Sequence, residues 1–69
     1  MTAKERVAAF LLEHATRAYC DACLARALGI DPSTAYRAAS RIGSVNGFVR
    51  QYALCSECGM SRLTIRAQG

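Results

Sequence analysis

With 69 residues the chain has room for one domain, and its apolar content of 52% excludes wholesale disorder. A domain of this size buries only about 60% of the surface of its unfolded chain, so a disulfide, a metal or a partner subunit usually adds stability. Nine basic and five acidic residues give a net charge of +4, which permits an anionic partner such as nucleic acid without requiring one.

Signals for membrane insertion and export are weak. The longest apolar run, residues 7–12, is far shorter than the ~20 residues that span a bilayer. The basic start followed by this run imitates a signal peptide, but Glu13 and His14 interrupt it. We therefore expect a cytoplasmic protein without membrane contact, in a compartment that disfavours disulfides.

The first predicted helix covers residues 2–16. Thr2 followed by Glu5 forms a capping-box pattern, in which each side chain meets a free amide at the helix start. Apolar positions then recur with helical spacing at Val7, Phe10, Leu11 and His14. The pattern predicts an amphipathic helix with a histidine at the end of its buried stripe.

The second predicted helix covers residues 21–28 and follows a segment, residues 17–20, that is compatible with a brief strand or a turn. Gly29 ends this helix, because glycine readily takes the left-handed backbone of a helix terminus. The positions expected to be buried are Cys23, Leu24, Ala27 and Leu28.

The third predicted helix covers residues 32–43. Asp31 stands at the N-cap position and Pro32 at the first helical position, where a missing amide hydrogen costs nothing. The positions expected to face the core are Ala35, Ala38, Ala39 and Ile42.

Two strands are predicted after the turn signal Asn46-Gly47. Residues 48–54 are rich in aromatic and β-branched side chains, although Arg50 shares a face with apolar ones. In the last segment Leu63, Ile65 and Ala67 alternate with Arg62, Thr64 and Arg66. The order helix, helix, helix, hairpin predicts a single domain over residues 1–69, mainly α with a small β-hairpin (α+β).

Four cysteines form two Cys-x-x-Cys pairs, Cys20 with Cys23 and Cys55 with Cys58. Two thiolates at this spacing can reach one ion, and two such pairs complete the tetrahedron that zinc prefers in structural sites. Gly59 suits a turn whose amides point back toward sulfur. The pattern predicts one structural zinc per chain. Four thiolate charges against two on the zinc would lower the net charge from +4 to +2.

The cysteines also have other interpretations. They could form disulfides, a thiol redox centre or a set of buried apolar thiols. Iron at four thiolates is an alternative to zinc, and His14 is an alternative ligand. Catalytic zinc is disfavoured, because such a site has three protein ligands and an open position. With no acid–base pair nearby, we expect no enzymatic activity.

The stretch LARALGIDPSTAYRAASRI contains an alanine-bearing helix, Leu-Gly-Ile at a turn, and a Ser/Thr-led helix with Tyr-Arg. Residues 22–42 thereby resemble the helix-turn-helix of bacterial transcription regulators. With the first helix and the hairpin, nearly the whole chain is similar in element order to the winged helix-turn-helix superfamily. The resemblance implies three helices plus a two- or three-stranded wing, in which a short strand ending near Cys20 pairs antiparallel with the last strand. That pairing would bring the two cysteine pairs together.

The resemblance also implies double-stranded DNA as the partner, with residues 32–43 as a recognition helix in the major groove. It makes base contacts the expected role of Ser33, Thr34 and Arg37. It assigns bases or phosphate to Tyr36, Ser40 and Arg41, and backbone phosphate to Arg50, Arg62 and Arg66.

The resulting expectation is a zinc-stabilised DNA-binding module with a regulatory role in transcription. A module of this size makes few contacts, so specific binding would need a homodimer or a protein partner. The alternative is a zinc-stabilised protein–protein interaction module that does not bind DNA, because one fold supports several functions.

Overall fold

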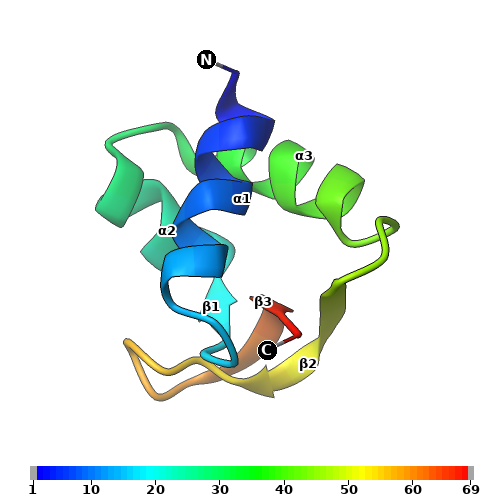
Figure 1. Cartoon of the computed structure of the whole chain (residues 1–69). Helices are drawn as coiled ribbons and strands as arrows, with labels where there is room; N and C mark the ends of the chain where they lie inside the picture. The colour runs from blue at the N-terminus through cyan, green and yellow to red at the C-terminus, as the bar shows by residue number, and fades with distance from the viewer. Residues whose placement is uncertain (1, 69) are drawn as a thin grey trace.

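The computed structural model describes residues 2–68 as three helices and a three-stranded antiparallel sheet (Figure 1). The elements follow in the order α1 (Ala3–Glu13), β1 (Tyr19–Cys20), α2 (Asp21–Leu28), α3 (Pro32–Ile42), β2 (Phe48–Leu54) and β3 (Ser61–Ala67). In Figure 1 the helices lie above the sheet, and the β2–β3 hairpin extends below them. The predicted α+β class is confirmed.

Helix α1 is shorter than predicted, since it ends at Glu13 and not at residue 16. The chain leaves the helix at His14, and Thr16 takes a left-handed backbone with φ of 72°. The Thr16 amide donates a hydrogen bond to the Ala67 carbonyl of β3 at 3.0 Å. This contact holds residue 16 at the sheet and prevents a further helical turn.

The buried stripe of α1 agrees with the sequence, and the predicted capping box is formed in part, because the Glu5 carboxylate meets the Thr2 hydroxyl and not a free amide. The Thr2 hydroxyl accepts a hydrogen bond from the Glu5 amide at 3.2 Å and donates one to the Glu5 carboxylate at 3.2 Å. Val7 and Leu11 are fully buried. Removing such side chains from water supplies about 1.5–3 kcal/mol each, which makes this stripe the main anchor of α1.

Helix α2 has the predicted bounds, and Gly29 ends it with a left-handed φ of 67°. Its buried side differs from the prediction. Ala25 packs in the core beside Leu24, whereas Ala27, which was expected to be buried, is exposed. The reason is the direction in which α2 packs: its Leu24–Ala25 side meets the core, and Ala27 lies at the rim of a surface hollow beside Arg26.

Helix α3 starts at Pro32 as predicted and ends one residue early, because Gly43 is its C-cap. Asp31 holds the N-cap position, but its side chain makes no capping hydrogen bond. The four positions predicted to face inward are all buried: Ala35, Ala38, Ala39 and Ile42. The small side chains of the three alanines let α3 lie close to α1 and α2.

The sheet has the strand order β1-β3-β2. Strand β1 pairs antiparallel with β3, with Tyr19 opposite Ile65 and Cys20 opposite Thr64. The short strand after the first helix, and its pairing with the last strand, are therefore confirmed. Strand β2 pairs antiparallel with the other edge of β3 over its full length.

The predicted alternation of buried and polar side chains along β3 is correct for the core positions and wrong at one polar position. Ile65 and Ala67 are fully buried, as predicted. Thr64, which was expected on the polar face, is also buried, with 1% of its surface exposed. Its hydroxyl donates a hydrogen bond to the Gln51 carbonyl at 2.9 Å, so the buried polar group is satisfied.

Candidate metal centre

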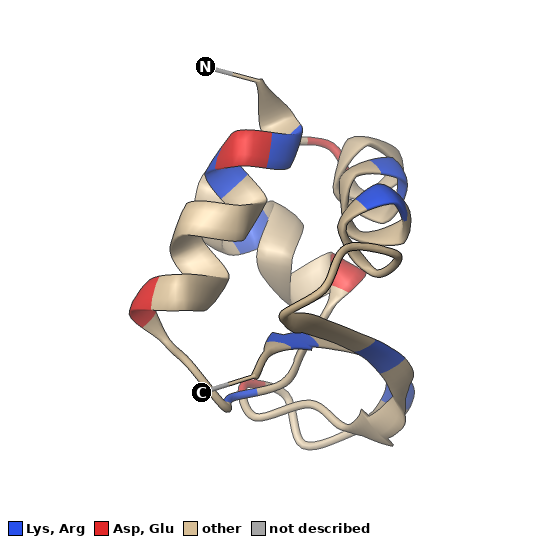
Figure 2. Ribbon diagram, turned by 45° about the vertical axis from the view of Figure 1, so that its right-hand side comes forward, with Lys and Arg blue, Asp and Glu red and all other residues tan. Residues whose placement is uncertain are grey.

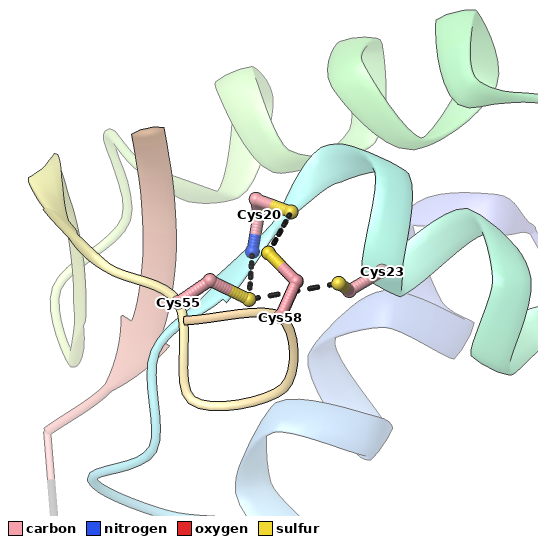
Figure 3. A group of neighbouring side chains, drawn as sticks. All are labelled: Cys20, Cys23, Cys55 and Cys58. Atoms are coloured by element: carbon pink, nitrogen blue, oxygen red, sulfur yellow. Dashed lines mark hydrogen bonds between the residues drawn. The ribbon is translucent and has the colours of Figure 1, made fainter. Parts of the chain in front are cut away.

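The four cysteines come from two segments that the sheet holds side by side (Figure 3). Cys20 ends β1 and is the N-cap of α2, and Cys23 lies in the first turn of that helix. Cys55 follows β2 directly, and Cys58 lies in the turn before β3. Because Cys20 stands opposite Thr64 of β3, the first pair lies next to the hairpin end that carries the second.

The sulfur atoms have the spacing of a tetrahedral metal site. All four lie within 4.8 Å of one another, with Cys20 Sγ 3.9 Å from Cys58 Sγ and Cys55 Sγ 3.6 Å from Cys23 Sγ (Figure 3). Zinc–sulfur bonds of about 2.3 Å at tetrahedral angles place two sulfurs ~3.8 Å apart, and the two observed distances bracket that value. All four thiols are free, so neither pair forms a disulfide.

A tight turn presents Cys55 and Cys58. The Gly59 amide donates to the Cys55 carbonyl at 2.9 Å, and the Cys55 amide donates to the Met60 carbonyl at 3.0 Å. Gly59 has a left-handed φ of 72°, a conformation that costs other residues roughly 1–2 kcal/mol. The glycine after the second pair is thus required by the backbone of the turn.

Ser56 fixes this turn to the segment before Cys20. Its amide donates to the Ala18 carbonyl at 2.8 Å, and its hydroxyl oxygen accepts from the Ala18 amide at 3.1 Å. The two cysteine pairs are therefore held together by protein contacts as well as by any shared ion. No sequence pattern marks Ser56 for this role, because its partner lies 38 positions earlier in the chain.

Hydrogen bonds give the thiols different proton affinities. Burial raises the pKa of Cys55, but hydrogen bonds from the amides of Cys58, Cys20 and Glu57 outweigh this and hold the pKa at about 6. The Cys20 amide lies 3.4 Å from Cys55 Sγ. Burial raises the pKa of Cys23, and hydrogen bonds from the neighbouring thiols raise it further. A bound cation deprotonates its thiol ligands, which would replace this unequal sharing of protons by four thiolates.

The donor set fits a structural metal. Soft thiolate ligands select zinc, copper(I) or iron over magnesium and calcium, which prefer oxygen. Four protein ligands fill a tetrahedron and leave no open position for a substrate. Cys20, Cys23 and Cys55 are buried and Cys58 is exposed, so solvent borders one corner of the cluster.

His14, the alternative ligand, lies in an aromatic cluster. Its ring centroid is 4.6 Å from that of Phe10 and 6.0 Å from that of Tyr19. Among residues 2–68, the group of side chains close enough to hold a metal consists of the four cysteines alone. His14 therefore completes the packing between α1 and β1.

An ion pair lies beside the cysteine cluster. The Arg50 guanidinium of β2 donates two hydrogen bonds to the Asp21 carboxylate at the start of α2, at 2.9 and 3.1 Å. The exposed fractions of the two side chains are 12% and 20%. This bidentate pair holds Arg50 within the fold, and the expected contact of Arg50 with DNA phosphate stays a prediction.

The polar side of α3 faces solvent (Figure 2). The α3 residues predicted to contact DNA are exposed, except for the half-buried Thr34: Ser33, Tyr36, Arg37, Ser40 and Arg41. At about 100° per residue, Ser33, Arg37 and Ser40 occupy the middle of this side. Tyr36 flanks it toward β2, where Arg50 Cζ lies 5.5 Å from the ring centroid.

The predicted basic residues of the hairpin do not form one surface. Arg50 stands opposite Ile65 on the face of the sheet that meets the helices. Arg62 and Arg66 lie on the other face, because neighbouring side chains of a strand alternate. Arg62 is exposed there and Arg66 is half-buried.

A basic residue that the sequence reasoning missed is Lys4. It lies in the first turn of α1 and lines a shallow surface hollow of about 220 Å³ together with Thr34, Arg37 and Arg41. Its position off the apolar stripe indicated exposure, but nothing local indicated that α1 starts beside α3. The hollow therefore brings three cations from two helices together.

None of the helices within residues 2–68 has the length and apolar character needed to cross a membrane. Comparison of the chain with protein-family models, with curated proteins and with solved structures finds no match. The resemblance of residues 22–42 to helix-turn-helix regulators therefore stays a prediction made from the sequence motif.

Proposed function

We propose that the chain is a zinc-stabilised winged helix-turn-helix domain that binds double-stranded DNA and acts in transcription regulation. The observation that supports this proposal is the pairing of β1 with β3 in a sheet packed against three helices, together with the exposed polar side of α3. In such a domain α3 enters the major groove, and the β2–β3 hairpin is the wing.

Zinc is proposed as the resident metal, with Cys20, Cys23, Cys55 and Cys58 as its ligands. Bound there, the ion would join the start of α2 to the hairpin and would stabilise the fold without taking part in a reaction. A tetrahedron of four thiolates suits zinc and iron alike, and zinc is proposed because the domain is small and its connections are short.

The surface of α3 suits a close approach to base edges. Arg37 stands between Ser33 and Ser40, whose short side chains leave its guanidinium free to reach outward. An arginine can bond both major-groove acceptors of guanine. Lys4 and Arg41, at the hollow between α1 and α3, would contact phosphates and set the orientation of the helix.

The test is DNA binding by the zinc-loaded protein and two variants. A duplex is first selected from a randomised pool, and affinity is then measured by fluorescence anisotropy at several salt concentrations. Arg37→Ala should weaken binding by about 1–3 kcal/mol, the value of one bidentate base contact. The matched control is Arg26→Ala, which removes an exposed arginine from α2. Equal affinities for the two variants would remove the recognition-helix assignment.

The alternative function, a protein-interaction module without DNA binding, is favoured by large exposed apolar side chains, among them Tyr36, Tyr52 and Leu54. Salt distinguishes the two functions. DNA affinity should fall steeply between about 50 and 200 mM salt as counterions are released. Absence of any selected duplex, with retained fold and zinc, would favour the interaction module.

A further inference from the structure

Strand β2 forms a free edge of the sheet, and its backbone hydrogen-bonding pattern can be assigned. The Gln68 amide donates to the Gly47 carbonyl at 2.7 Å, and the Cys55 amide donates to the Met60 carbonyl at 3.0 Å. Both Gly47 and Cys55 therefore direct backbone groups toward the β3 side. Hydrogen-bonded and non-hydrogen-bonded residues alternate in an antiparallel pair, so Val49, Gln51 and Ala53 do the same.

The residues between them direct their N–H and C=O groups outward. These residues are Arg50, Tyr52 and Leu54, whereas the amide of Phe48, at the start of the strand, donates to the Val45 carbonyl at 3.3 Å. Among residues 2–68 no strand pairs with this edge, because the sheet has the order β1-β3-β2. Strand β2 therefore offers three consecutive outward positions to a further strand.

The same three residues share one face of the sheet, and two of them expose large apolar side chains. Tyr52 is 78% exposed and Leu54 is 67% exposed. The strand contains no proline or lysine, which commonly protect free edges. Its one charge, on Arg50, is matched by Asp21 of the same chain. The edge is thus apolar, electrically balanced and open.

We propose that this edge binds a second copy of the chain, with β2 antiparallel to β2 of the partner subunit. The two-fold axis passes beside Tyr52, so that Tyr52 faces Tyr52 of the partner subunit. Arg50 then faces Leu54 of the partner subunit, and Leu54 faces Arg50 of the partner subunit. All outward N–H and C=O groups of the three residues are paired within the two strands.

Other antiparallel registers satisfy fewer groups. An axis at Gln51 places Leu54 opposite Phe48 of the partner subunit, whose amide is already bonded within its own chain. An axis at Ala53 places Arg50 opposite residue 56, beyond the end of the strand. The axis at Tyr52 also brings two exposed aromatic rings together, and cross-strand aromatic pairs stabilise antiparallel sheets.

This inference does not depend on the proposed DNA binding. It follows from the edge of β2 alone, and a dimer would help a chain of this size to remain folded. In the DNA-binding proposal the dimer would also supply two copies of α3, as palindromic sites require.

The first test is sedimentation equilibrium of the zinc-loaded protein over a range of concentrations. The wild type should reach a dimer, and Tyr52→Lys should weaken the dimer at least about tenfold, because like charges would face each other across the axis. Leu12→Lys is the control, since Leu12 is 61% exposed on α1, away from this edge. Circular dichroism and zinc content confirm that each variant is folded. A monomeric wild type, or equal effects of the two substitutions, would overturn the proposal.

The second test examines the register. Hydrogen-bonded antiparallel pairs have Cα atoms about 5.5 Å apart, a distance that a disulfide can bridge. With zinc bound, mild oxidation should link the Tyr52→Cys variant to itself across the axis. Leu54→Cys faces Arg50 of the partner subunit and should remain unlinked at the same protein concentration. Faster linking of Leu54→Cys would contradict the register even if the protein dimerises.

Discussion

Substitution of Asp21 by Asn tests whether the ion pair beside the cysteines stabilises the fold. The carboxylate accepts two hydrogen bonds from Arg50, and the side chains keep exposed fractions of only 20% and 12%. A hydrogen bond to a charged group contributes about 1.5–3 kcal/mol, and partial exposure lowers the value toward the smaller figure. A further ~0.5 kcal/mol comes from the negative charge at the start of α2. We expect Asp21→Asn to lower the free energy of unfolding by about 2 kcal/mol.

The assay is denaturant unfolding at a fixed concentration of free zinc, because bound metal itself adds to the stability. For a domain of this size, about 2 kcal/mol corresponds to a melting temperature lower by roughly 8–16 °C. A double-mutant cycle with Arg50→Met separates the ion pair from the helix-start effect and should give a coupling of about 1.5 kcal/mol. A coupling below about 0.5 kcal/mol, the value of a solvent-exposed pair, would show that the ion pair does not stabilise the fold.

Two further substitutions test a packing contact at Arg50 and a hydrogen bond beside the cysteine cluster. Gly43→Ala should lower stability by about 1–3 kcal/mol, because the added Cβ would lie 2.8 Å from Arg50 Cβ. The control in thermal unfolding is Ser40→Ala, at an exposed position of α3. Ser56→Ala should cost about 1–2 kcal/mol and weaken zinc affinity, because the Ala18 amide loses its acceptor. The comparison variant is Ser61→Ala, and a zinc-competition titration that shows equal affinities would argue against the Ser56 contact.

The sequence predicted most of the local structure, because its signals were local. Gly29 and Pro32 marked the junction between α2 and α3 correctly. The two Cys-x-x-Cys pairs predicted a four-sulfur cluster, and the implied pairing of β1 with β3 explained how distant pairs could meet. Helix periodicity predicted the inward positions of α3 correctly, since three alanines and Ile42 recur there with helical spacing among polar residues.

The incorrect predictions concern features that tertiary contacts determine. The extent of α1 was overestimated because the bond from Thr16 to Ala67 draws the chain into the sheet. Ala25 is buried in place of Ala27 because of the rotation of α2 about its own axis. The spacing of apolar residues in so short a helix does not determine this rotation. The ion pair between Arg50 and Asp21 was not predicted, because the two residues lie on different elements. Such pairings become visible only when the elements are placed together.

The central claim, a structural zinc held by four cysteines, is tested most directly by elemental analysis of the purified protein, with unfolding followed by circular dichroism on addition of a chelator. We expect one zinc per chain and loss of helical signal as the metal is removed. The same loss should follow substitution of Cys23 by Ser without chelator. A protein that contains no metal and keeps its native signal and melting temperature would show that no zinc holds this fold together.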